Sequence, residues 1–166
     1  EKEKNTALLN DLTEMEKSAL KCKEIIQNLL SFTRKSDAKK EQLHLSDLIN
    51  KAIRVIQLQA KPIGVEIQFR SQISDDSIVG TENPLVQSLV NILQNALDAV
   101  LSLAAESKKT QKDYAPLIEV ELSQNKSNFF IDVFDNGIGL GKNEQLKAFT
   151  PFFTTKNSDL HRGLGL

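Results

Sequence analysis

The chain has 166 residues, of which 40% are hydrophobic and 26% charged, a composition typical of a globular protein with one core and an accessory element. The net charge of -1 and the scattered Lys and Arg residues exclude nucleic acid as an expected partner. Cys22 is the only cysteine, which excludes internal disulfides and cysteine zinc sites and favours a reducing, cytoplasmic compartment. No apolar run approaches membrane-spanning length and no signal peptide is evident, so no membrane contact is expected from these residues.

A heptad pattern occupies the N-terminal segment, which has no Gly or Pro from Lys4 to about Lys35. Its apolar residues recur at alternating spacings of four and three: Leu8, Leu12, Met15, Ala19, Cys22, Ile26 and Leu29. Further apolar residues widen the stripe, which predicts a helix in a bundle of several helices. Dimerisation through this helix is favoured over folding back onto the same chain, and Cys22 is interpreted as a small buried hydrophobe rather than a redox sensor.

A charged linker and a second helix are predicted next. Residues 37–44 are expected to form the linker, and a helix with Ser46 as N-cap then runs to about Ala60. The core-facing positions of this helix are Leu48, Ile49, Ala52, Ile53, Ile56 and Leu58. His44 has no second ligand type nearby, so it is interpreted as hydrogen-bonded or solvated rather than catalytic.

Two strands and a long helix follow. Strict alternation predicts a strand over Val65–Arg70, and Ile78–Val79 form a short strand after a turn at Asp75–Asp76. The long helix begins near Pro84 and reaches about Glu106. One of its sides is apolar and predicted to be buried: Leu85, Leu89, Ile92, Leu93, Ala96 and Val100.

A second stripe of the long helix is polar and consists of Gln87, Asn91, Asn95 and Asp98. A solvated face is one explanation, but solvated faces are usually rich in Lys and Glu, and Asp98 is the only charged residue between Pro84 and Ala105. Buried asparagines need partners, which a polar ligand or hydrated metal supplies. A binding role is therefore favoured.

An acidic turn ends the last predicted strand. After an exposed excursion at Ser107–Pro116, strands are predicted at Ile118–Leu122 and Phe129–Phe134. The second has apolar residues on both faces, so it is expected to be buried, and it leads into the turn Asp135-Asn136-Gly137-Ile138-Gly139-Leu140. There a carboxylate can bond an amino group while glycines let a flat ring approach the backbone. A plain tight turn is the alternative.

The C-terminal stretch combines aromatic residues, cations and glycines. Packing in a core would account for the phenylalanines of Phe149–Lys156 alone. Lys156 and the run Arg162-Gly163-Leu164-Gly165-Leu166 place cations beside a glycine turn that can open a helix, an arrangement that suits phosphate oxygens.

Together these motifs resemble the catalytic end of bacterial sensor histidine kinases, whose ATP-binding fold is shared with gyrase, Hsp90 and MutL. Residues 87–99 resemble the N box, Asp135–Gly139 the first glycine box, Phe149–Lys156 the F box and Gly163–Leu166 the second glycine box. Each motif is unspecific alone, but four in this order within about eighty residues are very specific. The N-terminal helix, which ends in the segment Cys22–Arg34, resembles the second helix of the family's dimerisation and histidine-phosphotransfer hairpin.

The resemblance implies an α+β fold, namely a two-layer α/β sandwich with a mixed sheet, C-terminally truncated and preceded by the long bundle-forming helix. Residues 1–36 would be the dimerisation helix, 37–44 the linker and 45–166 the ATP-binding domain. The implied cofactors are ATP and Mg²⁺, with ATP between the helices and a flexible lid.

The resemblance also assigns roles by position. Asp135 would accept from the adenine amino group, with Gly137 and Gly139 making room for the ring. Asn95 would bind Mg²⁺, and Asn91 would assist at the phosphates as the catalytic residue. The other expected nucleotide-binding positions are Asp98, Phe149, Lys156, Arg162, Gly163 and Gly165. Asn91 stands where ATPase relatives carry a water-activating glutamate, and because an amide cannot be that base, transfer to a protein is favoured over gyrase-like hydrolysis.

Three departures from the family qualify this expectation. His161 and Arg162 precede Gly163 where another glycine is usual, which would stiffen the lid or alter phosphate contacts. The family's phosphorylated histidine lies on the preceding helix, and neither His44 nor His161 matches it, so this chain is not expected to phosphorylate itself. The chain also stops where the family continues, so we expect a truncated fold or one completed by swapping or by a partner.

The leading hypothesis is the ATP-binding catalytic portion of a sensor histidine kinase. It would pass the γ-phosphate to a histidine outside this chain and thence to a response-regulator aspartate. The expected partners are a second copy of the chain and a response-regulator receiver domain. The expected location is the cytoplasm, either for a cytoplasmic protein or for the cytoplasmic part of a membrane-anchored sensor. The alternative is a nucleotide-binding or interaction module without phosphotransfer.

Overall fold

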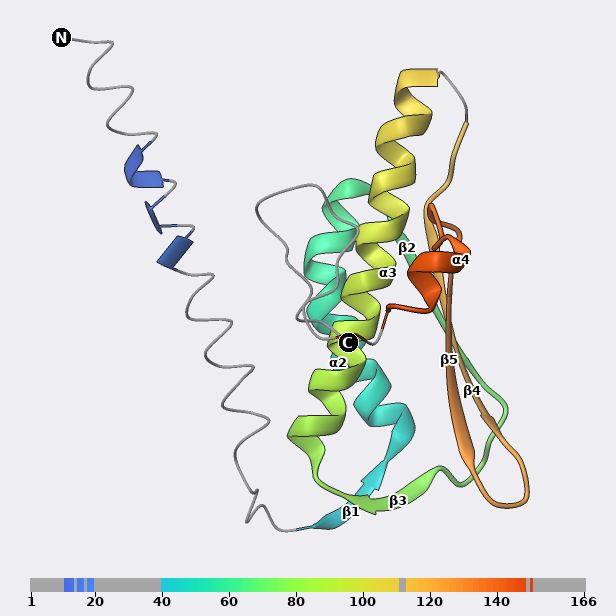
Figure 1. The fold of residues 1–166 in the computed structure, drawn as a ribbon. Coiled ribbons are helices and arrows are strands. Elements are labelled where there is room, and N and C mark those ends of the chain that lie inside the picture. The colour runs from blue at the N-terminus through green and yellow to red at the C-terminus, as the bar shows by residue number, and fades with distance from the viewer. Residues whose placement is uncertain are drawn as a thin grey trace, which may run out of the picture. The chain divides into compact units, whose positions relative to one another are not determined.

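The computed structural model describes residues 40–110, 113–148 and 150, together with 11–13, 15, 16, 18 and 19. The chain divides into two units, Glu1–Asp37 with Phe149–Leu164 and Ala38–Ala148 with Gly165–Leu166. The second unit holds β1 (Glu41–His44), α2 (Leu45–Ala60), the 3-10 turn η1 (Lys61–Ile63), β2 (Glu66–Ser71), β3 (Ser77–Gly80), α3 (Glu82–Thr110), β4 (Leu117–Gln124), β5 (Phe129–Asp135) and α4 (Lys142–Gln145), shown in Figure 1.

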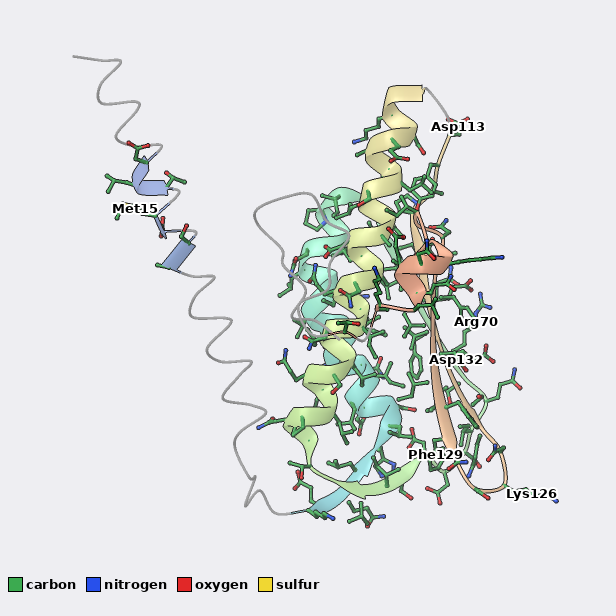
Figure 2. The ribbon with its side chains drawn as sticks, in the orientation of Figure 1. Met15, Arg70, Asp113, Lys126, Phe129 and Asp132 are labelled. Carbon is green, nitrogen blue, oxygen red and sulfur yellow. The ribbon has the colours of Figure 1, made fainter. Side chains whose placement is uncertain are left out.

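In the first unit, the described residues between 11 and 19 are helical, as the heptad pattern predicts for these positions. Three positions of the seam are described and exposed: Leu12 by 54%, Met15, labelled in Figure 2, by 68%, and Ala19. Cys22 and the other seam positions, Leu8, Ile26 and Leu29, lie outside the described residues.

The second unit has two layers. Helices α2 and α3 pack against each other and cover one face of a three-stranded sheet with the strand order β2-β4-β5 (Figure 1). Strand β2 is parallel to β4, with α3 in the connection between them, and β4 is antiparallel to β5. The mixed sheet under two helices confirms the predicted sandwich. Strands β1 and β3 form a separate antiparallel pair.

The core lies between the helices and the sheet. Alternate residues of β4, namely Ile118, Val120 and Leu122, are at most 2% exposed because successive side chains point to opposite faces of a strand. The helices contribute Leu48, Ile49, Ala52, Ile53, Ile56, Leu89, Leu93, Ala96, Leu97 and Val100. Each large apolar side chain buried here stabilises the fold by roughly 1.5–3 kcal/mol.

Two predicted core positions are wrong. Leu58 on α2 is 79% exposed and Ile92 on α3 is 40% exposed. Both residues are apolar, but the face of each helix that meets the other layer is centred elsewhere; on α3 the buried side includes Leu97 instead.

Helix α3 runs to Thr110 and so takes up part of the excursion predicted after residue 106. By length and composition alone, its segment Glu82–Lys108 would be able to cross a membrane, with a mean hydropathy of 1.3 in its most apolar window. Its buried residues instead pack against α2 and the sheet, so we interpret it as the central core helix of this domain.

Strand β5 differs from the prediction of burial on both faces. Phe129, Ile131 and Val133 pack on the core, whereas Phe130 and Phe134 on the other face are 43% and 56% exposed. The reason is the layer order: in the described part of the chain, helices cover only one face of the sheet.

The N-terminus of α2 is capped from a distant loop rather than by the predicted Ser46. His44 occupies the N-cap position, and its side chain makes no cap hydrogen bond. The backbone N–H of Ser46 donates to Asp76 Oδ2 at 2.6 Å, and that of Leu45 donates to the Asp76 carbonyl oxygen at 3.2 Å. The predicted linker also contains strand β1, whose pairing with β3 brings Asp76 to this place.

The Asp76 carboxylate is buried and bonds two residues. Besides Ser46, it bonds His44 through Oδ1 and Nδ1 at 3.0 Å, in agreement with the interpretation of His44 as a hydrogen-bonded histidine. Burial alone would raise the pKa of Asp76, but the hydrogen bonds from Ser46 and His44 outweigh it and the pKa lies below its usual value. The carboxylate therefore stabilises the fold in its charged form.

We expect Asp76→Asn to lower the free energy of unfolding by about 1 kcal/mol near neutral pH, because a charged cap is lost. A group whose pKa is lowered on folding stabilises the protein above its unfolded pKa of about 3.9, and this contribution is lost as the pH falls through the folded pKa. The difference between wild type and variant should thus shrink in acid. Urea unfolding followed by circular dichroism measures both effects.

Asp47→Asn is the matched control, since Asp47 lies exposed in the same first turn of α2. It should lose only a few tenths of a kcal/mol from the helix dipole. An equal loss in the two variants would contradict the capping role of Asp76.

Candidate functional site

The acidic turn begins where β5 ends. Asp135 is opposite Ile118 in the ladder with β4 and is exposed. Its Oδ1 accepts the backbone N–H of Gly137 at 2.9 Å, a local bond that aspartates often make two residues on in turns. One carboxylate oxygen is thus used inside the turn, and no hydrogen bond within the described residues engages the other. The turn is both a tight turn and a carrier of a carboxylate.

The turn docks on the backbone of α3. A Cβ atom on Gly137 would lie 2.4 Å from the carbonyl carbon of Ala99 and 2.6 Å from the nitrogen of Val100, so only glycine fits. The N–H of Ile138 donates to the Ala99 carbonyl oxygen at 3.3 Å. The sequence predicts that Gly137 makes room for a ring, but the space it leaves is taken by the helix. Gly139 differs, because it has open space around it and a φ of +66°, which favours glycine.

The polar stripe of α3 ends just before this docking point. Asn91, Asn95 and Asp98 are half-buried, whereas Gln87 is exposed. Gln87 donates to Asn91 Oδ1 at 3.0 Å, and Gln94 donates to Asp98 Oδ1 at 3.1 Å.

Among the stripe residues near the turn, Asn95 is the one whose side chain is available to bind a ligand. Its amide makes no hydrogen bond among the described residues, and it lies one helical turn, about 6 Å of axial rise, before Ala99. The contact of Gly137 with Ala99 therefore brings the Asp135 turn close to Asn95 on α3. The predicted site residues 91, 95, 98, 135, 137 and 139 come from two elements in contact.

Two further residues of the turn region were given no role by the sequence. Asn136 Oδ1 accepts from the Tyr114 hydroxyl and from Leu117 N–H, both at 2.9 Å, and its Nδ2 donates to the Ala115 carbonyl oxygen at 2.8 Å. Burial, and then the negative charge of Asp135, raise the pKa of Tyr114 above its usual value. The sequence signal that could have indicated a role for Tyr114 is that it is the chain's single tyrosine and lies in a lysine-rich stretch next to a predicted strand.

The other predicted site residues lie outside the described residues: Phe149, Lys156, Arg162, Gly163 and Gly165, together with His161. Their roles remain predictions. Within the described ranges, no group of three or more His, Cys, Asp or Glu side chains could hold a metal ion by itself.

Comparison with known proteins identifies related chains. Residues 80–166 match the family described as histidine kinase-, DNA gyrase B-, and HSP90-like ATPase. The signal transduction histidine-protein kinase AtoS of Escherichia coli is 31% identical over 145 residues, which are 86% of this chain and 22% of AtoS. The sensor protein FixL of Bradyrhizobium diazoefficiens is 31% identical over 150 residues, 89% of this chain and 28% of FixL. The chain thus spans less than a third of these relatives.

Solved structures share the fold. The catalytic domain of histidine kinase ThkA superposes with a TM-score of 0.62 at 20% identity, covering 76% of this chain and 74% of that domain. ThkA in complex with the response regulator protein TrrA gives a TM-score of 0.64 at 17% identity, over 83% of this chain and 38% of the ThkA chain. The predicted sandwich is confirmed as that of histidine kinase catalytic domains.

We expect Gly137→Ala to lower the free energy of unfolding by about 1–3 kcal/mol, because the methyl group would displace the turn from α3. Gly141→Ala is the matched control: its Cβ would meet only the flexible Glu144 carboxylate at 3.2 Å, and its cost should stay within about 0.5 kcal/mol. Thermal unfolding of both variants measures the difference. Equal stability of the two variants would show that the turn does not depend on this contact.

Proposed function

Because the chain belongs to the histidine kinase-, DNA gyrase B- and HSP90-like ATPase family, we propose that it is the ATP-binding catalytic portion of a two-component sensor histidine kinase. The observation that carries the proposal is the docking of Gly137 on Ala99, which brings a carboxylate and an asparagine stripe together. A carboxylate suits the amino group of adenine at one end of ATP, and asparagine side chains suit the metal-bound phosphates at the other end. The kinase names of the relatives support the same activity.

At the adenine end, Asp135 would accept a hydrogen bond from the 6-amino group. Oδ1 already accepts from Gly137, which leaves Oδ2 to face the base. Gly139 has no atom within 4 Å of a Cβ position, so the backbone there is open to a flat ring. The carboxylate gives selectivity, because only an amino donor at that position satisfies it.

At the phosphate end, Asn95 would hold Mg²⁺ and Asn91 would contact the phosphates, with Asp98 beside them. Mg²⁺ usually takes few protein ligands and fills its octahedron with phosphate oxygens and water, so one available amide is compatible with such a site. When bound, the ion would neutralise charge that develops on the transferred phosphoryl group. Phe149, Lys156, Arg162, Gly163 and Gly165 are proposed to complete the nucleotide site.

The proposed reaction is phosphoryl transfer to a histidine outside this chain. A histidine nitrogen attacks the γ-phosphorus while the bond from phosphorus to the β,γ-bridging oxygen breaks, and ADP leaves with that oxygen. Asn91 cannot remove a proton from water, which disfavours hydrolysis. The role of these residues is to orient ATP, as positioning and electrostatics dominate such reactions.

Membership of the family also suggests the two groups that accept the phosphoryl group in turn, first a histidine and then an aspartate. His44, the last residue of β1, is bonded to Asp76, and we assign it a structural role. The phosphoryl group would pass from the histidine to an aspartate of a response-regulator receiver domain; the relative ThkA has been solved with such a regulator. We further propose a homodimer through the N-terminal helix, where Leu12 and Met15 are exposed, and a cytoplasmic location for this portion.

We expect Asp135→Ala to weaken ATP binding roughly 10- to 100-fold, the loss of a hydrogen bond to a charged group, without unfolding the protein. Calorimetry with MgATP measures the affinity. Asp132→Ala is the matched control, since Asp132 is exposed on the same strand (Figure 2) and is opposite Glu121 rather than at the turn. Unchanged affinity in Asp135→Ala would refute the adenine site.

We expect Asn95→Ala to slow phosphotransfer roughly tenfold or more, because a metal contact is lost. The assay supplies the histidine-bearing hairpin helix in trans with Mg²⁺ and labelled ATP, and follows phosphohistidine. Asn83→Ala, at an exposed position in the first turn of α3, should leave the rate unchanged. Measurable ATP binding without phosphohistidine in the wild type would instead favour the binding-module alternative.

A further inference from the structure

Asn136 fastens the acidic turn to the segment that leads into β4. Its side chain makes three hydrogen bonds, to the Tyr114 hydroxyl, Leu117 N–H and the Ala115 carbonyl oxygen. Its backbone N–H also donates to the Leu117 carbonyl oxygen at 3.3 Å. Every donor and acceptor that this residue offers towards the neighbouring segment is therefore in use, apart from one amide hydrogen.

Tyr114 reinforces the same contact. Its hydroxyl lies 2.9 Å from Asn136 Oδ1 and 3.1 Å from the Asn136 carbonyl oxygen, so it binds side chain and backbone of one residue together. The pKa of Tyr114 is raised by burial and by the charge of Asp135, which keeps the hydroxyl protonated as a donor at physiological pH.

These bonds give the turn a second attachment besides its contact with α3. Gly137 is fixed against Ala99 of the helix, and Asn136 is fixed against residues 114–117. Asp135 precedes both anchors, and its Oδ1 accepts a hydrogen bond from the Gly137 N–H. The bond from Gly137 N–H to Oδ1 therefore links the orientation of the carboxylate to a backbone that is held on both neighbouring residues.

We propose that Asn136 and Tyr114 are positioning residues that aim the Asp135 carboxylate and so set the selectivity of the site for a 6-aminopurine over a 6-oxopurine. This inference rests on the proposed nucleotide-binding function. A fixed carboxylate accepts from a 6-amino group and repels a 6-oxo group, whereas a carboxylate free to turn avoids the repulsion by facing water. Loss of the clamp should therefore reduce selectivity and not only affinity.

The structure contains a matched control at the other end of the same hairpin. Asn125 Oδ1 accepts from Ser127 N–H and Asn128 N–H, both at 2.9 Å, in the turn between β4 and β5. Asn125→Ala removes the same kind of side-chain to backbone bonds far along the strands from Asp135. A purely structural role of Asn136 would give the two alanine variants the same binding behaviour.

The test compares the dissociation constants of MgATP and Mg inosine triphosphate, which carries a 6-oxo group, in the full-length protein. Wild type and Asn125→Ala should prefer ATP at least tenfold. In Asn136→Ala this ratio should fall to about threefold or less, and Tyr114→Phe, which removes only the hydroxyl, should lie between. The ratio is insensitive to partial unfolding, which weakens both ligands equally.

The outcomes separate this inference from the proposed function. A wild-type protein that binds neither nucleotide, or binds both equally, would overturn the proposed adenine site and this inference with it. A wild-type preference for ATP that persists in Tyr114→Phe and in folded Asn136→Ala would overturn the positioning role alone. If Asn136→Ala does not fold, the ratio in Tyr114→Phe decides.

Discussion

The approach of the Gly137 backbone to the Ala99 backbone is the constraint on which the candidate site depends. The two main chains are so close that any side chain at residue 137 would overlap the helix. The contact joins the end of β5 to the middle of α3, two elements that are separated in sequence by the whole of β4. It also brings the Asp135 turn, two residues before Gly137, close to Asn95, one helical turn before Ala99, which is why both residues are assigned to the proposed site.

The ends of the elements are held in a similar way elsewhere in the domain. Asp76, in a loop thirty residues away, accepts a hydrogen bond from a backbone N–H at the N-terminus of α2. In the acidic turn, the Asn136 side chain bonds Tyr114 and the segment that leads into β4. In each case a polar side chain replaces backbone hydrogen bonds that the end of a helix or strand leaves unmade. Because α2 packs on α3, the capping of α2 supports the helix that carries the asparagine stripe.

Local periodicity accounts for most of what the sequence predicts correctly. Alternation located β2, β4 and β5, and the apolar stripe located α2 and most of the buried side of α3. The predicted N-cap Ser46 was wrong because the group that satisfies this helix end comes from a distant loop. The predicted burial of Phe130 and Phe134 was wrong because strand patterns report apolarity and not which face of the sheet is covered.

The candidate site was partly predictable for the same reason. Residues 91, 95, 135, 137 and 139 follow from composition, spacing and resemblance. The use of Gly137 for helix contact, and the clamp of Asn136 with Tyr114, depend on long-range packing that has no signature in a short stretch of sequence. A glycine in the sequence can make room either for a ligand ring or for a neighbouring helix, and only the tertiary structure distinguishes the two uses.

The most direct test of the account is a titration of the isotopically labelled protein with MgADP, followed through backbone amide resonances. The account predicts shifts centred on Asn95, Gly137 and Gly139, with Asn125 at the far end of the β4–β5 hairpin unchanged. Saturable shifts confined to other parts of the molecule, or no shifts at millimolar nucleotide, would contradict the assignment of the helix-turn junction as a nucleotide site.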